Sequence, residues 1–225
     1  MAKAEKKSIT NSFSKFIKWF WILFLSGIAF VALIFLSASW GLFGELPPYE
    51  YLENPQTNLA SQIISSDGNL LGKFYLDDNR TDIKFDDLPE NLVNTLIASE
   101  DIRFMDHSGI DARGTLRAFA YLGSKGGAST ISQQLARQLF VGVRSRSKFD
   151  AIKQKLKEWV LAIRLERSYT KEEIISMYLN IYDFGNNADG IRSAARIYFG
   201  KEPIDLKVEE SAMLVGMLQN SSLFN

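Results

Sequence analysis

The stretch WFWILFLSGIAFVALIFLSASWGLF, residues 19–43, is the most distinctive part of this sequence and contains no charged side chain. An α-helix needs about 20 predominantly apolar residues to cross the hydrocarbon core of a bilayer. A secretory signal peptide is the alternative, but its apolar part has only about 7–15 residues and precedes a cleavage site of small residues. The sequence therefore predicts a transmembrane helix over residues 19–43.

The charges on either side of this stretch predict its orientation. Glu45 and Glu50 follow it, whereas the residues before it include Lys3, Lys6, Lys7, Lys15 and Lys18. Basic residues are enriched on the cytoplasmic side of a membrane. We therefore expect residues 1–18 to form a cytoplasmic tail and the rest of the chain to lie outside. Residues 44–61 are expected to be a linker and residues 62–225 a folded domain.

The overall composition argues against several classes of function. The 26 basic and 26 acidic residues balance, so no global positive field draws the chain to nucleic acid. The absence of cysteine excludes disulfides, zinc–cysteine sites and thiol nucleophiles. Neither a Walker loop nor a dinucleotide-binding fingerprint occurs in the sequence. We therefore expect no nucleic-acid partner and no nucleotide-driven chemistry.

Local patterns predict a mainly α domain with a small β element. Two β-prone runs flank Asp67-Gly68 within residues 62–84, which indicates a hairpin. Apolar residues at helix spacing predict one helix that ends near Glu100 and a long helix over residues 149–167.

Capping patterns predict three further helices. Thr130 with Gln133, and Thr170 with Glu173, resemble capping boxes. They are expected to open helices that run through Phe140 and Ile181. A last helix, over residues 206–219, is expected to have Asp205 as its cap.

Glu100 is a candidate general base because it continues the apolar face formed by Val93 and Ile97. Burial favours the neutral form of a carboxylate, which makes such a group useful for proton transfer near neutral pH. The spacing also allows a helix-end carboxylate that turns outward or pairs with Arg103. From the residues alone both readings stay open.

Glu158 is the second candidate carboxylate, because it aligns with a minor apolar stripe formed by Leu161 and Leu165 on the long helix. An ion pair with Lys155 at helix spacing is the alternative. Enzymes that make or break a glycosidic bond usually use two carboxylates held away from water.

His107 is flanked by Asp106 and Ser108, yet no nucleophile-elbow serine occurs in the sequence. We therefore expect His107 to be a structural, hydrogen-bonded histidine.

Several ordered motifs resemble those of the family 51 glycosyltransferases. ASEDIRFMDHSGID, residues 98–111, resembles the first family signature, EDxxFxxHxG, and GASTISQQ, residues 127–134, resembles the second, GxSTxTQQ. The third, RKxxE, is matched by QKLKE at residues 154–158. YLN at residues 178–180, GIRSAARIYFGK at residues 190–201 and ESAMLVGMLQNSS resemble later family segments.

This resemblance implies a lysozyme-like glycosyltransferase fold and an inverting peptidoglycan glycosyltransferase. By this resemblance Glu100 is the general base that deprotonates the acceptor sugar when lipid II is polymerised. Glu158 is expected to assist at the diphosphate end of lipid II. The resemblance implies no definite cofactor. The one candidate is a divalent cation, Mg²⁺ or Mn²⁺. The implied substrate-binding residues are Asp101, Phe104, His107, Ser129, Thr130, Gln133, Gln134, Arg137, Lys155 and Asn180.

The expected partners are lipid II, the nascent glycan, the bacterial inner membrane and proteins of cell-wall synthesis. The catalytic domain is expected on the periplasmic or extracellular side. Two departures from the family stand out: Gln154 replaces an arginine, and the chain stops at Asn225, where we expect the domain to be truncated. A lysozyme-type lytic enzyme and a catalytically silent membrane scaffold are the competing interpretations.

Overall fold

The computed structural model describes residues 2–42, 44, 46–48, 61–67, 70–74, 81–121, 127–143 and 145–219. The chain divides into two compact units, residues 1–46 and residues 47–225. Each unit is described by itself.

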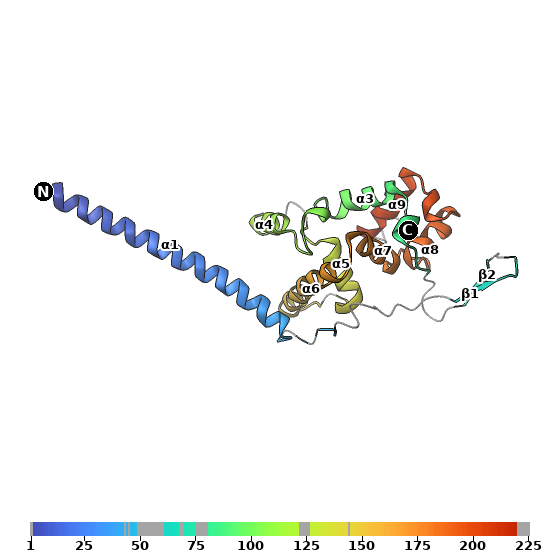
Figure 1. Ribbon diagram of the computed structural model, residues 1–225, viewed down its shortest axis with the longest axis horizontal. Helices are drawn as coiled ribbons and strands as arrows, with labels where there is room; N and C mark the ends of the chain where they lie inside the picture. Colours follow the sequence, from blue (N-terminus) through green and yellow to red (C-terminus); the bar gives the residue numbers. More distant parts are fainter. Residues whose placement is uncertain are drawn as a thin grey trace. The chain divides into compact units, whose positions relative to one another are not determined.

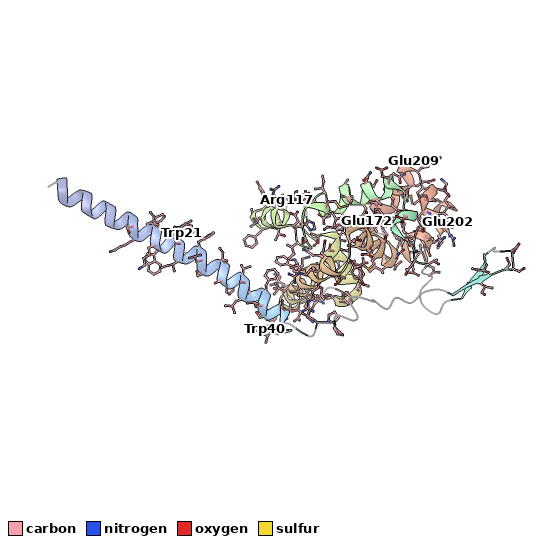
Figure 2. The ribbon with its side chains drawn as sticks, in the orientation of Figure 1. Trp21, Trp40, Arg117, Glu172, Glu202 and Glu209 are labelled. Carbon is pink, nitrogen blue, oxygen red and sulfur yellow. The ribbon has the colours of Figure 1, made fainter. Side chains whose placement is uncertain are left out.

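The first unit is dominated by one long helix, α1, Ala2–Ser39 (Figure 1). Within it, Ser14–Ser39 has a mean hydropathy of 2.5 and is the one described helix long and apolar enough to cross a membrane. The helix begins earlier than the stretch predicted at residues 19–43 and ends at Ser39, because Trp40 begins a turn. Figure 2 shows Trp21 and Trp40, both largely exposed, near the two ends of the apolar segment.

The second unit begins with the predicted hairpin. Strands β1, Ser61–Ile64, and β2, Leu70–Phe74, pair antiparallel, and Ile64 pairs with Leu70. The hairpin is shorter than the range 62–84 suggested, because residues 81–84 form no strand. Gly68, the second residue of the expected turn, lies outside the described residues.

The rest of the second unit is helical, which confirms the mainly α prediction (Figure 1). Its α-helices are α3 (Glu90–Glu100), α4 (Ala112–Ala120), α5 (Ile131–Ala136), α6 (Lys148–Ser168), α7 (Lys171–Ile181), α8 (Gly190–Phe199) and α9 (Val208–Gln219). Short 3-10 turns are η1 (Phe85–Asp87), η2 (Phe104–Asp106) and η4 (Pro203–Asp205), and a π-helical turn, η3 (Arg137–Val141), continues α5.

Two of the predicted caps are confirmed and one is wrong. Thr130 caps α5 by accepting a hydrogen bond from the Gln133 backbone N–H, and Thr170 forms a full capping box with Glu173 at α7. Asp205 caps nothing, since it lies inside the turn η4 and α9 begins only at Val208.

Two helices, α4 and α8, were not predicted. The only buried residue of α4 is Gly114, and Leu116 and Phe119 are exposed, so no apolar stripe marks a core-facing side. The buried face of α8 consists of Ile191 and small residues such as Ser193 and Ala194, so few large apolar side chains mark its core-facing side. Periodicity finds a helix only where large apolar side chains repeat on one face.

The core forms where α5 packs between α6 and α7, while α3 packs against α9. Leu135 of α5, Leu161 of α6 and Ile174 of α7 are fully buried. Burial of an aliphatic side chain contributes about 1.5–3 kcal/mol, so this three-helix contact stabilises the segments that carry the site.

Gly109 is required where the turn after α3 touches α6. It has a φ of +91°, and a Cβ placed there would lie 2.8 Å from the Ala162 carbonyl carbon of α6. We expect Gly109→Ala to lower the free energy of unfolding by about 2–4 kcal/mol through strain and overpacking, which lowers Tm by roughly 5–15 °C. Thermal unfolding in detergent measures this loss.

Gly127→Ala is the matched control, because nothing lies within 4 Å of a Cβ at Gly127. Equal melting temperatures for the two variants would contradict the close contact between Gly109 and α6.

Candidate active site

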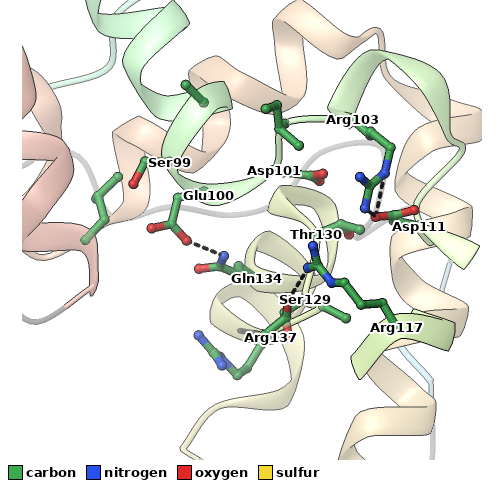
Figure 3. Close-up of a pocket in the computed structure, with 15 residues that line it drawn as sticks. Ser99, Glu100, Asp101, Arg103, Asp111, Arg117, Ser129, Thr130, Gln134 and Arg137 are labelled. Atoms are coloured by element: carbon green, nitrogen blue, oxygen red, sulfur yellow. Dashed lines mark hydrogen bonds and ion pairs between the residues drawn. The ribbon is translucent and has the colours of Figure 1, made fainter. Parts of the chain in front are cut away.

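An open cleft of about 680 Å³ lies at the C-terminal end of α3 (Figure 3). The end of α3 and the turn that follows form one side, residues 127–130 and α5 form another, and Leu218 of α9 also lines it. The predicted site residues that line it are Glu100, Asp101, Ser129, Thr130, Gln134 and Arg137.

Glu100 is the last residue of α3, and its carboxylate faces α5 (Figure 3). Its Oε2 accepts a hydrogen bond of 2.8 Å from the Gln134 side-chain N–H. Its Oε1 is buried and has no hydrogen-bond partner among the described residues. The alternative of a pair with Arg103 is wrong, because the guanidinium of Arg103 binds Asp111 instead. Glu100 therefore keeps one carboxylate oxygen without a hydrogen bond from the described residues.

Asp101 holds the turn after α3 against the start of α5. Its buried Oδ2 lies 3.0 Å from His107 Nε2 and accepts a hydrogen bond of 3.2 Å from the Ile131 backbone N–H. His107 is therefore a hydrogen-bonded residue, as expected from the sequence. The contact with Ile131 joins the first and second signature segments.

Five of the predicted substrate-binding residues contact protein groups and do not line the cleft: Phe104, His107, Gln133, Asn180 and Lys155, the last of which is described below. Phe104 is fully buried, with Lys171 Nζ 4.1 Å from its ring centroid. Gln133 Nε2 donates to the Gly109 carbonyl at 3.3 Å. Asn180 exchanges two hydrogen bonds with the backbone of Ile83, at 3.1 and 2.9 Å. With His107 they form the frame behind the cleft, and direct binding of substrate by them stays a prediction.

Thr130 belongs both to this frame and to the cleft wall. Its Oγ1 donates to the Gly109 carbonyl at 2.7 Å and accepts from the Gln133 backbone N–H at 3.1 Å. The hydroxyl proton and one of its lone pairs are thereby bound by protein partners, and these bonds fix the loop that lines the cleft.

Lys155 links the second predicted carboxylate to the cleft. Its Nζ lies 2.9 Å from Glu158 Oε2 and donates to Ser129 Oγ at 2.8 Å. Glu158 is only 2% exposed, so both interpretations of it hold: it is buried, and it pairs with Lys155 at helix spacing. Removing one member of a buried ion pair leaves an uncompensated charge. Glu158 therefore fixes the ammonium group beside Ser129.

Gln154, which replaces the family arginine, forms hydrogen bonds with the backbone of Ser145 and Val143. Its Oε1 accepts from the Ser145 N–H at 2.8 Å and its Nε2 donates to the Val143 carbonyl at 3.1 Å. An arginine has no acceptor and could not reproduce the first of these bonds. Ser132, which replaces a family threonine, donates to Glu166 at 2.5 Å. Both substitutions thus serve the protein frame.

The surroundings of Glu158 do not fit the candidate divalent cation. Its carboxylate already accepts a hydrogen bond from a positively charged ammonium group. Nowhere in the described parts of the chain do three or more histidine, aspartate or glutamate side chains gather to hold a metal ion. Mg²⁺ is held by carboxylate and other oxygen ligands in near-octahedral geometry, which this arrangement does not offer.

Arg103, Asp111 and Arg117 line the cleft but were missed by the sequence reasoning. Arg103 Nε donates to Asp111 Oδ2 at 3.1 Å, and Asp111 directly precedes α4 (Figure 3). The two residues are 8 positions apart and belong to different elements, so no helical or strand period pairs them. Only the recurrence of charge within and shortly after the first signature could have drawn attention to them.

Two kinds of comparison with known proteins bear on this site. The family model described as transglycosylase matches residues 67–225. Penicillin-binding protein 1A of Pseudomonas aeruginosa is 35% identical over 215 residues, which cover 94% of this chain and 25% of the relative.

Two other relatives give the same result. Penicillin-binding protein 1A of Escherichia coli strain K12 is 36% identical over 219 residues, covering 94% of this chain and 25% of the relative. The Vibrio cholerae protein of the same name is 37% identical over 185 residues, covering 80% and 22%. This chain spans about a quarter of the length of these relatives.

A mainly helical domain with a glutamate at an open cleft, preceded by one apolar helix, is the arrangement of a peptidoglycan glycosyltransferase domain. The chain belongs to the transglycosylase family. The fold expected from its sequence motifs is thereby confirmed.

The Arg103–Asp111 pair predicts a pH-dependent part of the stability. The hydrogen bond from Arg103 lowers the pKa of Asp111 in the folded state. A lowered folded-state pKa contributes stability above the unfolded value of about 3.9 and loses it as pH falls through the folded pKa. As pH falls from about 5 to about 2, we expect the wild type to lose more stability than Asp111→Asn, measured as urea midpoints in detergent. Parallel pH dependences in the two proteins would rule out this contribution.

Proposed function

We propose that this domain polymerises lipid II into β-1,4-linked glycan and releases undecaprenyl diphosphate, with Glu100 as general base. Membership of the transglycosylase family supports the reaction class. The observation that carries the assignment of the base is the carboxylate of Glu100, which has Oε2 held by Gln134 and Oε1 without a partner among the described residues. A carboxylate held in this way is oriented and still has an unmet acceptor.

In the proposed reaction the acceptor hydroxyl supplies the donor that Glu100 Oε1 lacks. The carboxylate takes the proton of the 4-hydroxyl of the acceptor N-acetylglucosamine as that oxygen bonds to the anomeric carbon of the lipid-linked N-acetylmuramic acid. The bond from this carbon to the diphosphate oxygen breaks, and its electron pair leaves with undecaprenyl diphosphate. Attack opposite the leaving group inverts the anomeric carbon, and the base must lie within about 2.6–3.2 Å of the hydroxyl oxygen.

The negative charge that develops on the diphosphate requires cations held in advance. Arg137 lines the cleft, and Lys155 reaches its wall through Ser129. In this proposal Glu158 has a positioning role, because its ion pair holds Lys155 in place. The proposal assigns no metal ion to Glu158, because its carboxylate already pairs with Lys155.

The long apolar helix supports a location of this chemistry at a membrane. In the proposed topology residues 1–18 are cytoplasmic, α1 spans the inner membrane, and the domain from residue 62 onward works on the outer side. The lysines before residue 19 and the acidic residues after the helix support this orientation. Lipid II, which is embedded in the same membrane, is then presented to a tethered enzyme.

The deciding experiment is polymerisation of labelled lipid II in detergent by the purified chain, resolved on a gel. We expect the wild type to lengthen lipid-linked glycan and Glu100→Gln to be about 10²–10⁴ times slower, because the amide cannot accept the proton. Glu172→Gln is the control, since Glu172 is exposed on α7.

Shortening of finished glycan would instead identify a lytic enzyme. Equal polymerisation by the wild type and Glu100→Gln would remove Glu100 from its role as base.

A further inference from the structure

Tyr178 is a fully buried tyrosine on α7 that does not line the cleft. Its hydroxyl donates a hydrogen bond of 3.0 Å to Gln134 Oε1. The other end of the same amide, Gln134 Nε2, donates to Glu100 Oε2 at 2.8 Å. A continuous hydrogen-bonded chain therefore runs from the core of the domain to the carboxylate at the cleft.

The amide of Gln134 has one donor end and one acceptor end, and the two ends have nearly the same shape. A bond to either end fixes the direction of the whole group. Because Tyr178 donates to the carbonyl oxygen, the N–H₂ group must face Glu100. The opposite orientation would place a carbonyl oxygen against an ionised carboxylate, which is repulsive.

Tyr178 has the properties of a permanent donor. Burial raises the pKa of its phenol far above the ordinary value, and the nearby charge of Glu100 raises it further. A phenol that keeps its proton throughout the working pH range keeps its O–H available as a donor to Gln134 Oε1.

We propose that Tyr178 is a positioning residue that orients the Gln134 amide, and thereby holds the Glu100 carboxylate directed toward the acceptor sugar. This inference rests on the proposed function of Glu100 as base. Tyr178 itself contacts neither the cleft nor any reacting atom. Its effect reaches the reaction only through Gln134.

The test compares Tyr178→Phe with Tyr198→Phe in the lipid II polymerisation assay. Each variant removes one buried or half-buried hydroxyl, but Tyr198 donates to the Phe184 carbonyl at 2.9 Å, away from the cleft. We expect Tyr178→Phe to lower kcat about tenfold and to leave KM within about twofold of the wild-type value. The variant loses the hydrogen bond that orients the Gln134 amide, and such a bond contributes about 1 kcal/mol. Tyr198→Phe should keep kcat within about twofold.

The split between kcat and KM gives a readout that a merely structural role would not move. Loss of orientation at the base lowers kcat and leaves KM nearly unchanged, whereas general damage to the cleft also raises KM. An unchanged kcat in Tyr178→Phe, or a loss confined to KM, would overturn the inference.

A double-mutant cycle with Gln134→Ala tests the route of the effect. If Tyr178 acts through Gln134, Tyr178→Phe has little further effect in the Gln134→Ala background, so the two losses are not additive. Full additivity would show that Tyr178 acts by another route and would overturn the proposal. An inactive wild type would contradict the proposed function itself, which keeps the two failures distinguishable.

Discussion

The carboxylate of Asp101 connects the two segments on which the cleft depends. It pairs with His107 and accepts the backbone N–H of Ile131, although Asp101 and Ile131 are 30 positions apart in the chain. Glu100 directly precedes this anchor, and Gln134 lies one helical turn after Ile131. The hydrogen bond between Glu100 and Gln134 therefore follows from the position that Asp101 imposes on both segments.

Packing and paired charges on the side away from the cleft also hold the turn after α3 and the start of α5. Gly109 lies against the backbone of Ala162, and its carbonyl accepts the hydroxyl of Thr130. Lys171 donates to the His107 carbonyl and pairs with Glu166 at 2.7 Å. Buried charges that are paired and hydrogen-bonded specify one arrangement, whereas a half-satisfied network would be costly. This frame holds the turn that carries Glu100 in a single place.

Local sequence patterns predicted those parts of the fold that local interactions determine. The helices α6 and α7 carry large apolar side chains at helix spacing, and Thr170 with Glu173 marks the start of α7. Helix α4 was not predicted: it contributes Arg117 to the cleft, and Gly114 is its only buried residue. Its larger apolar side chains, Leu116 and Phe119, are exposed and do not join the core.

The site was predictable only in part for a similar reason. The motif resemblance identified Glu100 and Gln134, and spacing alone left the orientation of Glu100 undecided. The contacts of Tyr178 with Gln134 and of Glu100 with Gln134 span 44 and 34 positions of sequence. No local period encodes such pairs, so they emerge only when α3, α5 and α7 are packed together.

The most direct test of the account separates binding from chemistry at Glu100. Fluorescent lipid II gives the Kd of the wild type and of Glu100→Gln, and a single-turnover experiment with prebound substrate gives the rate of the first glycosidic bond. The account predicts Kd values within about threefold of each other and a bond-forming rate about 10²–10⁴ times lower in the variant. Equal bond-forming rates, or a loss confined to Kd, would contradict the role of Glu100 as the base.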